Sequence, residues 1–535
     1  MKQTSPGRSQ CLDALAVALN ASCDGRGWFA STRQLQLASL QLCIACRSIP
    51  SLRLEVDMTV PHRLWVDAAG QNSCTPGKEL QKSSRVPPAR LHTVLWKMPA
   101  SLLVWSSGVL ANLKCLAFTD EFNDGVDDVV WPRGLQRLSF GTGFNQPIGG
   151  TFFPASLKQL EIGGNFNQPI DTVSWPASLE QLSFDGSLFN QPIEGIAWPQ
   201  SLTSITFGFA FNRPVKGVAW PPSLRHLEFG DFFNQPIDKV AWPAALERLK
   251  FGHDFNQEIE GMSWPASLQQ LTFGSLFNQA VERAVWPAAL RRLTFGLEFN
   301  KPIELVSRPR LPQTRVIQSC TRSAEETQEA TERGSWPASL RQLTFGDHFN
   351  QPVGRVVWSK SLQRLTFGRH FNQPFDNVSL PASLQILTFG MAFNQAIESV
   401  SWPKALQRLT FGYRFNQPIA SVSWPPSLRQ LTFGHRFNQT VGHVKWPISL
   451  RKLVFGHDFN QPIEGVTWPA SLQRLTFGDD FNQEIDRVSW PAALQYLLFG
   501  SRFRRSVHDI DWPVSLEHLV IGSQRQHVNR QVGGF

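Results

Sequence analysis

The chain has 535 residues, of which 17% are charged, and it contains 40 Phe, 37 Pro and 19 Trp but only 2 Tyr. Such a bias excludes an average over several unrelated domains and indicates one short unit copied many times. Recurrent Pro excludes a helical solenoid, because an interior Pro removes a helix hydrogen bond. No window approaches the ~18 uninterrupted apolar residues of a membrane span, so we expect no membrane contact.

The net charge of +9 is unevenly distributed. Residues 1–108 contain 12 Lys+Arg and 6 Asp+Glu, and residues 308–335 contain 5 Arg and 4 Glu, which leaves +2 for the rest of the chain. An array this close to neutral is not expected to bind nucleic acid. The 7 Cys are too few for a disulfide scaffold, and no secretory leader is evident. We therefore expect a cytoplasmic location, with a nuclear one left open.

Residues 1–108 lack the repeat described below and are expected to form a small helical or mixed segment. Leu12–Leu19 and Ser31–Arg47 have the patterns of two helices. Cys43 and Cys46 lie on the second of these, without further cysteines at a recognised metal-site spacing, so we interpret them as buried structural thiols. A hydrophobic cap for the following array is one interpretation of the whole segment, and a docking segment is the other.

From residue 109 onward a Trp-Pro pair, or a variant of it, recurs every 22 residues, except for one step of 23 and the interruption at residues 308–335. A constant step of this kind is typical of a solenoid. Within one copy, Leu271 and Phe273 are spaced i, i+2 and therefore face one side of a strand. The pattern predicts a mainly β solenoid of 22-residue coils with a continuous parallel sheet, nine coils in 109–307 and nine in 336–522. Ile259–Trp264 suggests a second extended segment on the opposite side of each coil.

A Phe-Asn pair appears 16 times at one fixed place in the coil. A catalytic Asn is not needed so often, whereas an Asn at a turn can hydrogen-bond the backbone of the adjacent coil. We therefore predict a structural ladder of stacked Asn side chains, to which belong Asn145, Asn278, Asn416 and Asn482.

The recurring phrase Pro-x-Ser-Leu-x-x-Leu-x-Phe-Gly-x-x-Phe-Asn-Gln-Pro-Ile, from about Val109 to Gly522, resembles the FNIP-repeat family, which is related in pattern to leucine-rich repeats (LRRs). The resemblance implies an LRR-like solenoid with a role in protein interaction, and it implies no reaction and no cofactor. The two helices expected in residues 1–108 also resemble an F-box, a motif paired with FNIP arrays, although its Leu-Pro opening is missing. That resemblance would make the chain a substrate receptor that docks onto ubiquitin-ligase subunits.

Two other segments depart from the repeat. Residues 308–335 are polar and add 28 residues to one step of the array. We expect a polar excursion there, and a decayed coil is the alternative. Residues 523–535 are expected to form a loose C-terminal tail.

The two residues after the strand Gly differ from copy to copy and should form a ridge along one edge of the sheet. Exposed Arg residues are also expected just before the second Leu of the coil, as at Arg248, Arg292, Arg364, Arg408 and Arg474. Either the ridge binds a partner protein, or it is a solvated edge whose sequence drifted freely. The hypothetical partner-binding residues are His348, His370, Tyr413, Arg414, His435, Arg436, His457, Asp458, Asp479 and Asp480.

His435 and His457 should be neighbours on this ridge. A stable metal site needs three or four ligands, and only Asp458 is an obvious third, so no metal is predicted. We expect protein recognition with some pH sensitivity between ~5 and ~7, where imidazoles titrate. No catalytic residue is predicted, and the protein is expected not to be an enzyme.

Overall fold

The computed structural model describes residues 113–304, 336–508, 510–522 and 524–526, together with the backbone of three strands in the segment before them. The chain divides into two compact units. Unit 1 comprises Met1–Gln235 and Val240–Leu246, and unit 2 comprises Pro236–Lys239 and Glu247–Phe535. The helices predicted in residues 1–108, Cys43 and Cys46 all lie outside the described residues.

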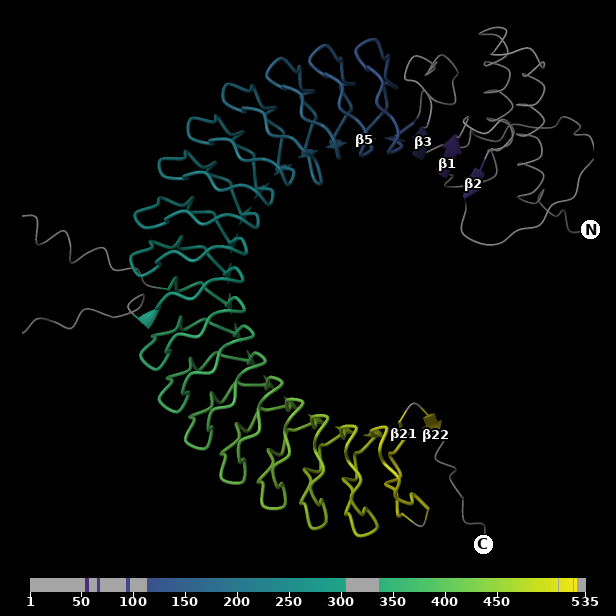
Figure 1. Ribbon diagram of the computed structural model, residues 1–535, viewed down its shortest axis with the longest axis vertical. Coiled ribbons are helices and arrows are strands. Elements are labelled where there is room, and N and C mark those ends of the chain that lie inside the picture. Colours follow the sequence, from purple (N-terminus) through teal and green to yellow (C-terminus); the bar gives the residue numbers. More distant parts are fainter. Residues whose placement is uncertain are drawn as a thin grey trace, which may run out of the picture. The chain divides into compact units, whose positions relative to one another are not determined.

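Each coil contributes one short strand to a parallel sheet and returns through a longer segment without strands (Figure 1). In unit 1, successive strands pair in parallel, and each residue lies beside its equivalent in the next coil. Leu116 thus lies beside Leu138, and Leu138 beside Leu160. The strands are β4 (Cys115–Phe118), β5 (Arg137–Phe140), β6 (Gln159–Ile162), β7 (Gln181–Ser183), β8 (Ser204–Thr206) and β9 (His226–Glu228).

The sheet of unit 1 extends beyond the predicted start of the array. Strand β3 (Thr93–Trp96) pairs in parallel with β4, and β1 (Arg53–Val56) pairs in parallel with β3. Strand β2 (Trp65–Asp67) is antiparallel to β1. Part of residues 1–108 therefore belongs to the sheet, although these residues contain no Trp-Pro pair.

Unit 2 has the same arrangement and uses the same register, with Leu271 beside Leu293 and Leu409 beside Leu431. Strand β22 (Gln524–Gln526) pairs antiparallel with β21, so these three residues are not the loose tail that was predicted. The parallel strands are β10 (Arg248–Lys250), β11 (Gln270–Thr272), β12 (Arg292–Thr294), β13 (Gln342–Thr344), β14 (Arg364–Thr366), β15 (Ile386–Thr388), β16 (Arg408–Thr410), β17 (Gln430–Thr432), β18 (Lys452–Val454), β19 (Arg474–Thr476), β20 (Tyr496–Phe499) and β21 (His518–Ile521).

The prediction of a mainly β solenoid with 22-residue coils is confirmed. The second extended segment of each coil is not a strand: Glu260 and Gly261 form a turn, and the residues that follow it make no ladder. Gly261 has a φ of 70°, a conformation that favours Gly over residues with a side chain. Among the described residues, no helix is long and apolar enough to cross a membrane.

The core of each coil is filled by apolar columns that run from coil to coil. In one coil of unit 2, Leu428, Leu431, Phe433 and Phe437 are at most 3% exposed. The Phe433 and Phe437 rings stack with centroids 4.0 Å apart, and Phe437 also stacks on Phe459 of the next coil at 6.1 Å. The repeated Phe therefore packs both within its own coil and against its copies, which explains why Tyr rarely replaces it: its hydroxyl would be buried.

Neighbouring coils approach most closely at the Gly that follows each strand. A Cβ built on Gly434 would overlap the backbone carbonyl of Gly412, and the same relation recurs between Gly456 and Gly434. Because this carbonyl is backbone and cannot rotate away, the position requires Gly for reasons of space.

The Asn side chains form a ladder of hydrogen bonds between coils. The backbone N–H of Asn416 donates to Asn394 Oδ1 at 2.8 Å, and that of Asn438 donates to Asn416 Oδ1 at 2.9 Å. The Gln439 side chain also donates to Asn416 Oδ1, at 3.0 Å. The other named Asn residues accept in the same way, Asn145 from Asn167, Asn278 from Asn300, and Asn482 from the backbone of Arg504.

We expect the substitution Asn416→Ala to lower the free energy of unfolding by ~1–3 kcal/mol, because it leaves the Asn438 N–H without its acceptor. The substitution Arg414→Ala, on the exposed ridge two residues away, should cost less than ~0.5 kcal/mol. Urea unfolding of both variants measures the difference. Equal shifts of the two midpoints would contradict the ladder.

The sheet continues in register across the segment between β12 and β13. Leu293 pairs directly with Leu343, and the Asn350 N–H donates to Asn300 Oδ1 at 3.0 Å. β12 and β13 are direct neighbours in the sheet, although the two Leu are 50 positions apart in the chain instead of 22. Residues 308–335 themselves lie outside the described residues, and their interpretation as a polar excursion stays a prediction.

Deleting residues 308–335 should therefore leave a soluble protein of equal or greater stability, because residues 307 and 336 would be joined with the normal 22-residue step. In the intact chain, we expect limited proteolysis to cut this segment first and to leave two large fragments that stay associated. Loss of soluble protein after the deletion would show that the segment forms part of the solenoid.

Candidate functional site

The ridge consists of the two residues that follow each strand Gly, arranged in two rows along the edge of the sheet. In unit 2 the backbone N–H of each second residue donates to the carbonyl of the first residue in the preceding coil. Asp458 donates to His435 at 2.9 Å, and Asp480 donates to His457 at 2.9 Å. Side chains of successive coils are thus held side by side, and all ten predicted partner-binding residues lie on this ridge.

Three rings stack along the first row of the ridge. The ring centroids of Tyr413 and His435 are 4.4 Å apart, and those of His435 and His457 are 4.3 Å apart with an interplanar angle of 6°. The Arg436 guanidinium lies over the Tyr413 ring at 5.8 Å. All of these side chains are at least partly exposed.

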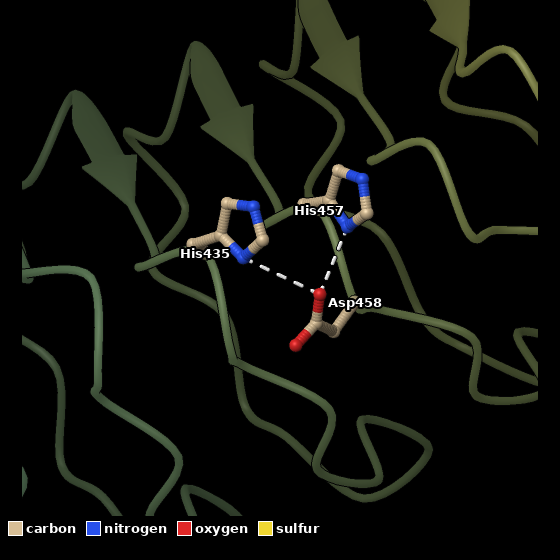
Figure 2. Close-up of side chains that lie close together, drawn as sticks. All are labelled: His435, His457 and Asp458. Atoms are coloured by element: carbon tan, nitrogen blue, oxygen red, sulfur yellow. Dashed lines mark hydrogen bonds and ion pairs between the residues drawn. The ribbon is translucent and has the colours of Figure 1, made fainter.

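Asp458 lies in front of both imidazoles, and the Nδ1 atoms of His435 and His457 both point toward it (Figure 2). Its Oδ1 is 2.8 Å from His457 Nδ1 and 3.3 Å from His435 Nδ1. The geometry permits a hydrogen bond only with His457, and His435 Nδ1 is buried without a hydrogen-bond partner among the described residues.

Two further carboxylates continue the cluster on the next coil. Asp479 Oδ2 is 3.6 Å from His457 Nε2, and Asp480 Oδ1 is 3.7 Å from His457 Nδ1 and 2.6 Å from the Arg502 guanidinium. The Ser501 backbone N–H, which donates to Asp479 Oδ1 at 2.9 Å, lowers the pKa of that carboxyl below its ordinary 3.8. The Ser501 side chain and the charges of His457 and Arg502 lower it further.

The remaining predicted ridge residues lie apart from this cluster. His348 Nδ1 is 2.8 Å from Glu298 Oε2, and the rings of His348 and His370 are 5.0 Å apart but tilted by 60°. Arg414 is exposed, and its side chain has no ion pair with any described residue.

A second surface, which we call the strand face, lies along the strands β11–β20 of unit 2. It comprises the two outward residues that flank the buried Leu of each strand and the residue just before the strand. Lys452 and Arg474 lie directly opposite each other on neighbouring strands. These three rows contain no Asp or Glu between Gln269 and Leu498, and their cations are Arg291, Arg292, Arg341, Arg364, Arg408, Arg429, Arg451, Lys452 and Arg474.

All of these side chains are exposed except that of Lys452, which is half-buried, and none has an ion pair with another described residue. The strand face of unit 1 differs, because Glu161, Glu180 and Glu228 lie among its cations and Lys158 pairs with Glu180 at 2.7 Å. The positive charge of the array is thus concentrated on the strand face of unit 2.

The sequence identified the ridge and five of the exposed Arg residues, and the structure places Arg292, Arg364, Arg408 and Arg474 on the strand face of unit 2. Sequence analysis missed the absence of acids from this face, because net charge was counted along the chain. Aligning the copies by strand position and counting charge in each row would have found it.

A model of the FNIP Repeat matches the chain at residues 144–187, 189–232, 233–276, 359–391, 393–436 and 459–502. Among solved structures, the chain is similar to CroV588, described as a novel circular LRR protein structure, with 35% sequence identity and a TM-score of 0.60. That match covers 81% of this chain and 66% of CroV588, so the chain spans slightly less than two thirds of the length of this relative.

Two further structural matches have low identity. An internalin from Listeria monocytogenes is 13% identical with a TM-score of 0.36, covering 56% of this chain and 80% of its own. The LRR protein LIC12759 from Leptospira interrogans is 16% identical with a TM-score of 0.38, covering 69% of this chain and 85% of its own. None of the curated proteins matches. With its repeat phrase, its coil register, the FNIP Repeat match and the similarity to CroV588, the chain belongs to the FNIP-repeat family of LRR-like solenoids.

Proposed function

We propose that this protein is a non-enzymatic scaffold that binds an acidic segment of a partner protein on the strand face of unit 2, with the ridge as the adjoining edge. The observation that supports this function is the charge of the strand face along β11–β20, which contains nine cations and no acid. FNIP membership and the LRR-like fold agree with a binding role. We also propose a cytoplasmic location.

The arrangement of the cations favours an extended acidic partner. Lys452 lies directly opposite Arg474, and Arg451 follows Arg429 with a backbone hydrogen bond of 2.9 Å between the two coils. Like charges that face each other on neighbouring strands destabilise a sheet. An acidic partner lying across the strands relieves this repulsion and gains many modest contacts, since the strand spacing of ~4.8 Å repeats along the array.

The residue types on the strand face favour a protein over a single-stranded nucleic acid as the partner. Proteins that bind single strands combine cationic grooves with aromatic side chains on which bases stack. On the strand face of β11–β20, Tyr496 is the single aromatic residue. The face therefore offers charge without a stacking platform.

The substrate-receptor role, in which residues 1–108 dock onto a ubiquitin ligase, concerns side chains outside the described part of the chain. The strand face proposed here serves equally as its substrate-binding surface, so the two roles differ only in what residues 1–108 contact.

The test uses the full chain and a fluorescent poly-glutamate peptide as the probe, with a single-stranded oligonucleotide in a parallel titration. Replacing Arg429 and Arg451 together by Glu should weaken peptide binding by at least about tenfold, and added salt should weaken binding to the unaltered chain. The oligonucleotide should bind more weakly than the peptide.

The matched control changes the charge by the same amount elsewhere. Arg355 and Lys404 are exposed and lie outside the strand face, so their joint replacement by Glu should leave peptide binding within about twofold. Equal losses in the two double variants would overturn the proposal, because net charge alone would then explain binding. Tighter binding of the oligonucleotide would instead identify nucleic acid as the partner.

A further inference from the structure

The ridge cluster of unit 2 brings three potential metal ligands together from two adjacent coils. One ligand atom from each of His435, His457 and Asp458 lies within 4.8 Å of the other two. The two imidazoles are nearly parallel, and their Nδ1 atoms face the Asp458 carboxylate from the same side (Figure 2). We propose that these three residues bind a divalent transition-metal ion such as Zn²⁺.

The distances from the carboxylate to the two nitrogens are close to those of a tetrahedral site. A zinc ion with bonds of about 2.0–2.1 Å to nitrogen and oxygen holds its ligand atoms roughly 3.3 Å apart. Asp458 Oδ1 lies 2.8 Å and 3.3 Å from the two Nδ1 atoms, so the carboxylate is already in place. Because each lone pair lies in the plane of its ring, the nearly parallel rings must tilt toward each other to direct both nitrogens at one ion, and their partial exposure allows this tilt.

A second observation is the state of His435. Its Nδ1 atom is buried and makes no hydrogen bond with any described residue. This nitrogen lies 3.3 Å from Asp458 Oδ1 without a hydrogen bond, and a metal bond to its lone pair would satisfy it.

The surroundings of His457 resemble those of a metal-bound histidine. Such a residue usually directs its other ring nitrogen at a carboxylate, which fixes its orientation. Asp479 Oδ2 lies 3.6 Å from His457 Nε2, on the side of the ring opposite Asp458. Asp479 and Asp480 also add negative charge, which offsets the nearby positive charge of Arg436 and Arg502.

The ligand set selects among metals. Two imidazoles and one carboxylate suit Zn²⁺, Cu²⁺, Ni²⁺ or Co²⁺, whereas Mg²⁺ and Ca²⁺ prefer sets made only of oxygen. Three protein ligands leave one position for water or for a group of a bound partner. The ion would also link two adjacent coils, because His435 belongs to one coil and His457 and Asp458 belong to the next.

The proposal is tested by calorimetric titration of the full chain with Zn²⁺ at neutral pH, with Mg²⁺ as a second titrant. We expect about one specific equivalent of Zn²⁺ and no comparable binding of Mg²⁺. The substitutions His457→Ala and Asp458→Asn should each weaken Zn²⁺ binding by at least about tenfold. Electron paramagnetic resonance of bound Cu²⁺ should show nitrogen ligands that are lost in the His457→Ala variant.

The chain contains a matched control in the group formed by His348, His370 and Glu298. It has the same residue types, but within the described part of the chain it does not bring one ligand atom of each residue within 4.8 Å of the other two. His370→Ala should therefore leave Zn²⁺ binding unchanged. Unchanged binding in Asp458→Asn, or an equal loss in His370→Ala, would overturn the proposed site. Thermal unfolding without metal should be the same in all variants, because these positions are partly exposed.

Discussion

Replacing Gly434 by alanine is expected to lower the free energy of unfolding by about 3 kcal/mol or more. The new Cβ would overlap the carbonyl of Gly412, and only a shift of one whole coil against the next can relieve the overlap. Because each coil of a solenoid contacts only its neighbours, the damage should be centred on the two coils that contain Gly412 and Gly434. Urea unfolding measures the loss, and hydrogen exchange of β16 and β17 locates it.

Gly442 provides the matched control, since a Cβ at this position meets no atom within 4 Å. The substitution Gly442→Ala should change stability by less than about 0.5 kcal/mol, or raise it slightly by restricting the unfolded chain. If both alanine variants unfold at the same urea concentration, close packing of the coils is not the reason for the repeated Gly.

The second large effect is expected for Phe437→Ala. This ring is fully buried and stacks on Phe433, Phe415 and Phe459, so its removal leaves a cavity that spans three coils. A loss of about 3–5 kcal/mol is typical of such a change. Phe437→Leu keeps most of the volume and should cost clearly less. Similar losses for Leu and Ala would show that ring stacking, and not cavity volume, dominates this column.

The fold could be predicted from the sequence because one pattern recurs in every coil. The i, i+2 spacing of Leu271 and Phe273 defines a strand with one buried face, and the structure pairs these strands in register. The second extended segment was predicted wrongly, because Ile259–Trp264 has a similar spacing of apolar residues. A turn at Gly261 interrupts that segment. Its apolar residues have this spacing because they are buried, and they make no strand ladder.

The candidate sites could be predicted only in part. Variation among copies located the ridge, and the constant step made His435 and His457 neighbours. The direction of their Nδ1 atoms and the reach of Asp458 across two coils depend on side-chain rotamers, which residue spacing does not specify. The sequence singled out these three residues without predicting a metal site, whereas the structure places three potential ligand atoms within 4.8 Å of one another.

The basic strand face could not be recognised from the net charge of the whole array. The array as a whole is nearly neutral, but acids such as Asp458, Asp479 and Asp480 lie on the ridge, whereas Arg429 and Arg451 lie on the strand face. Electrostatic recognition depends on this local arrangement more than on net charge.

The central claim, that the strand face of unit 2 is the partner-binding surface, is tested most directly by determining the structure of the full chain bound to an acidic peptide. The account predicts peptide density along the outward side chains of β11–β20, with carboxylates beside Arg429, Arg451 and Lys452. Density confined to the ridge, or to the turns on the opposite side of the coils, would contradict it.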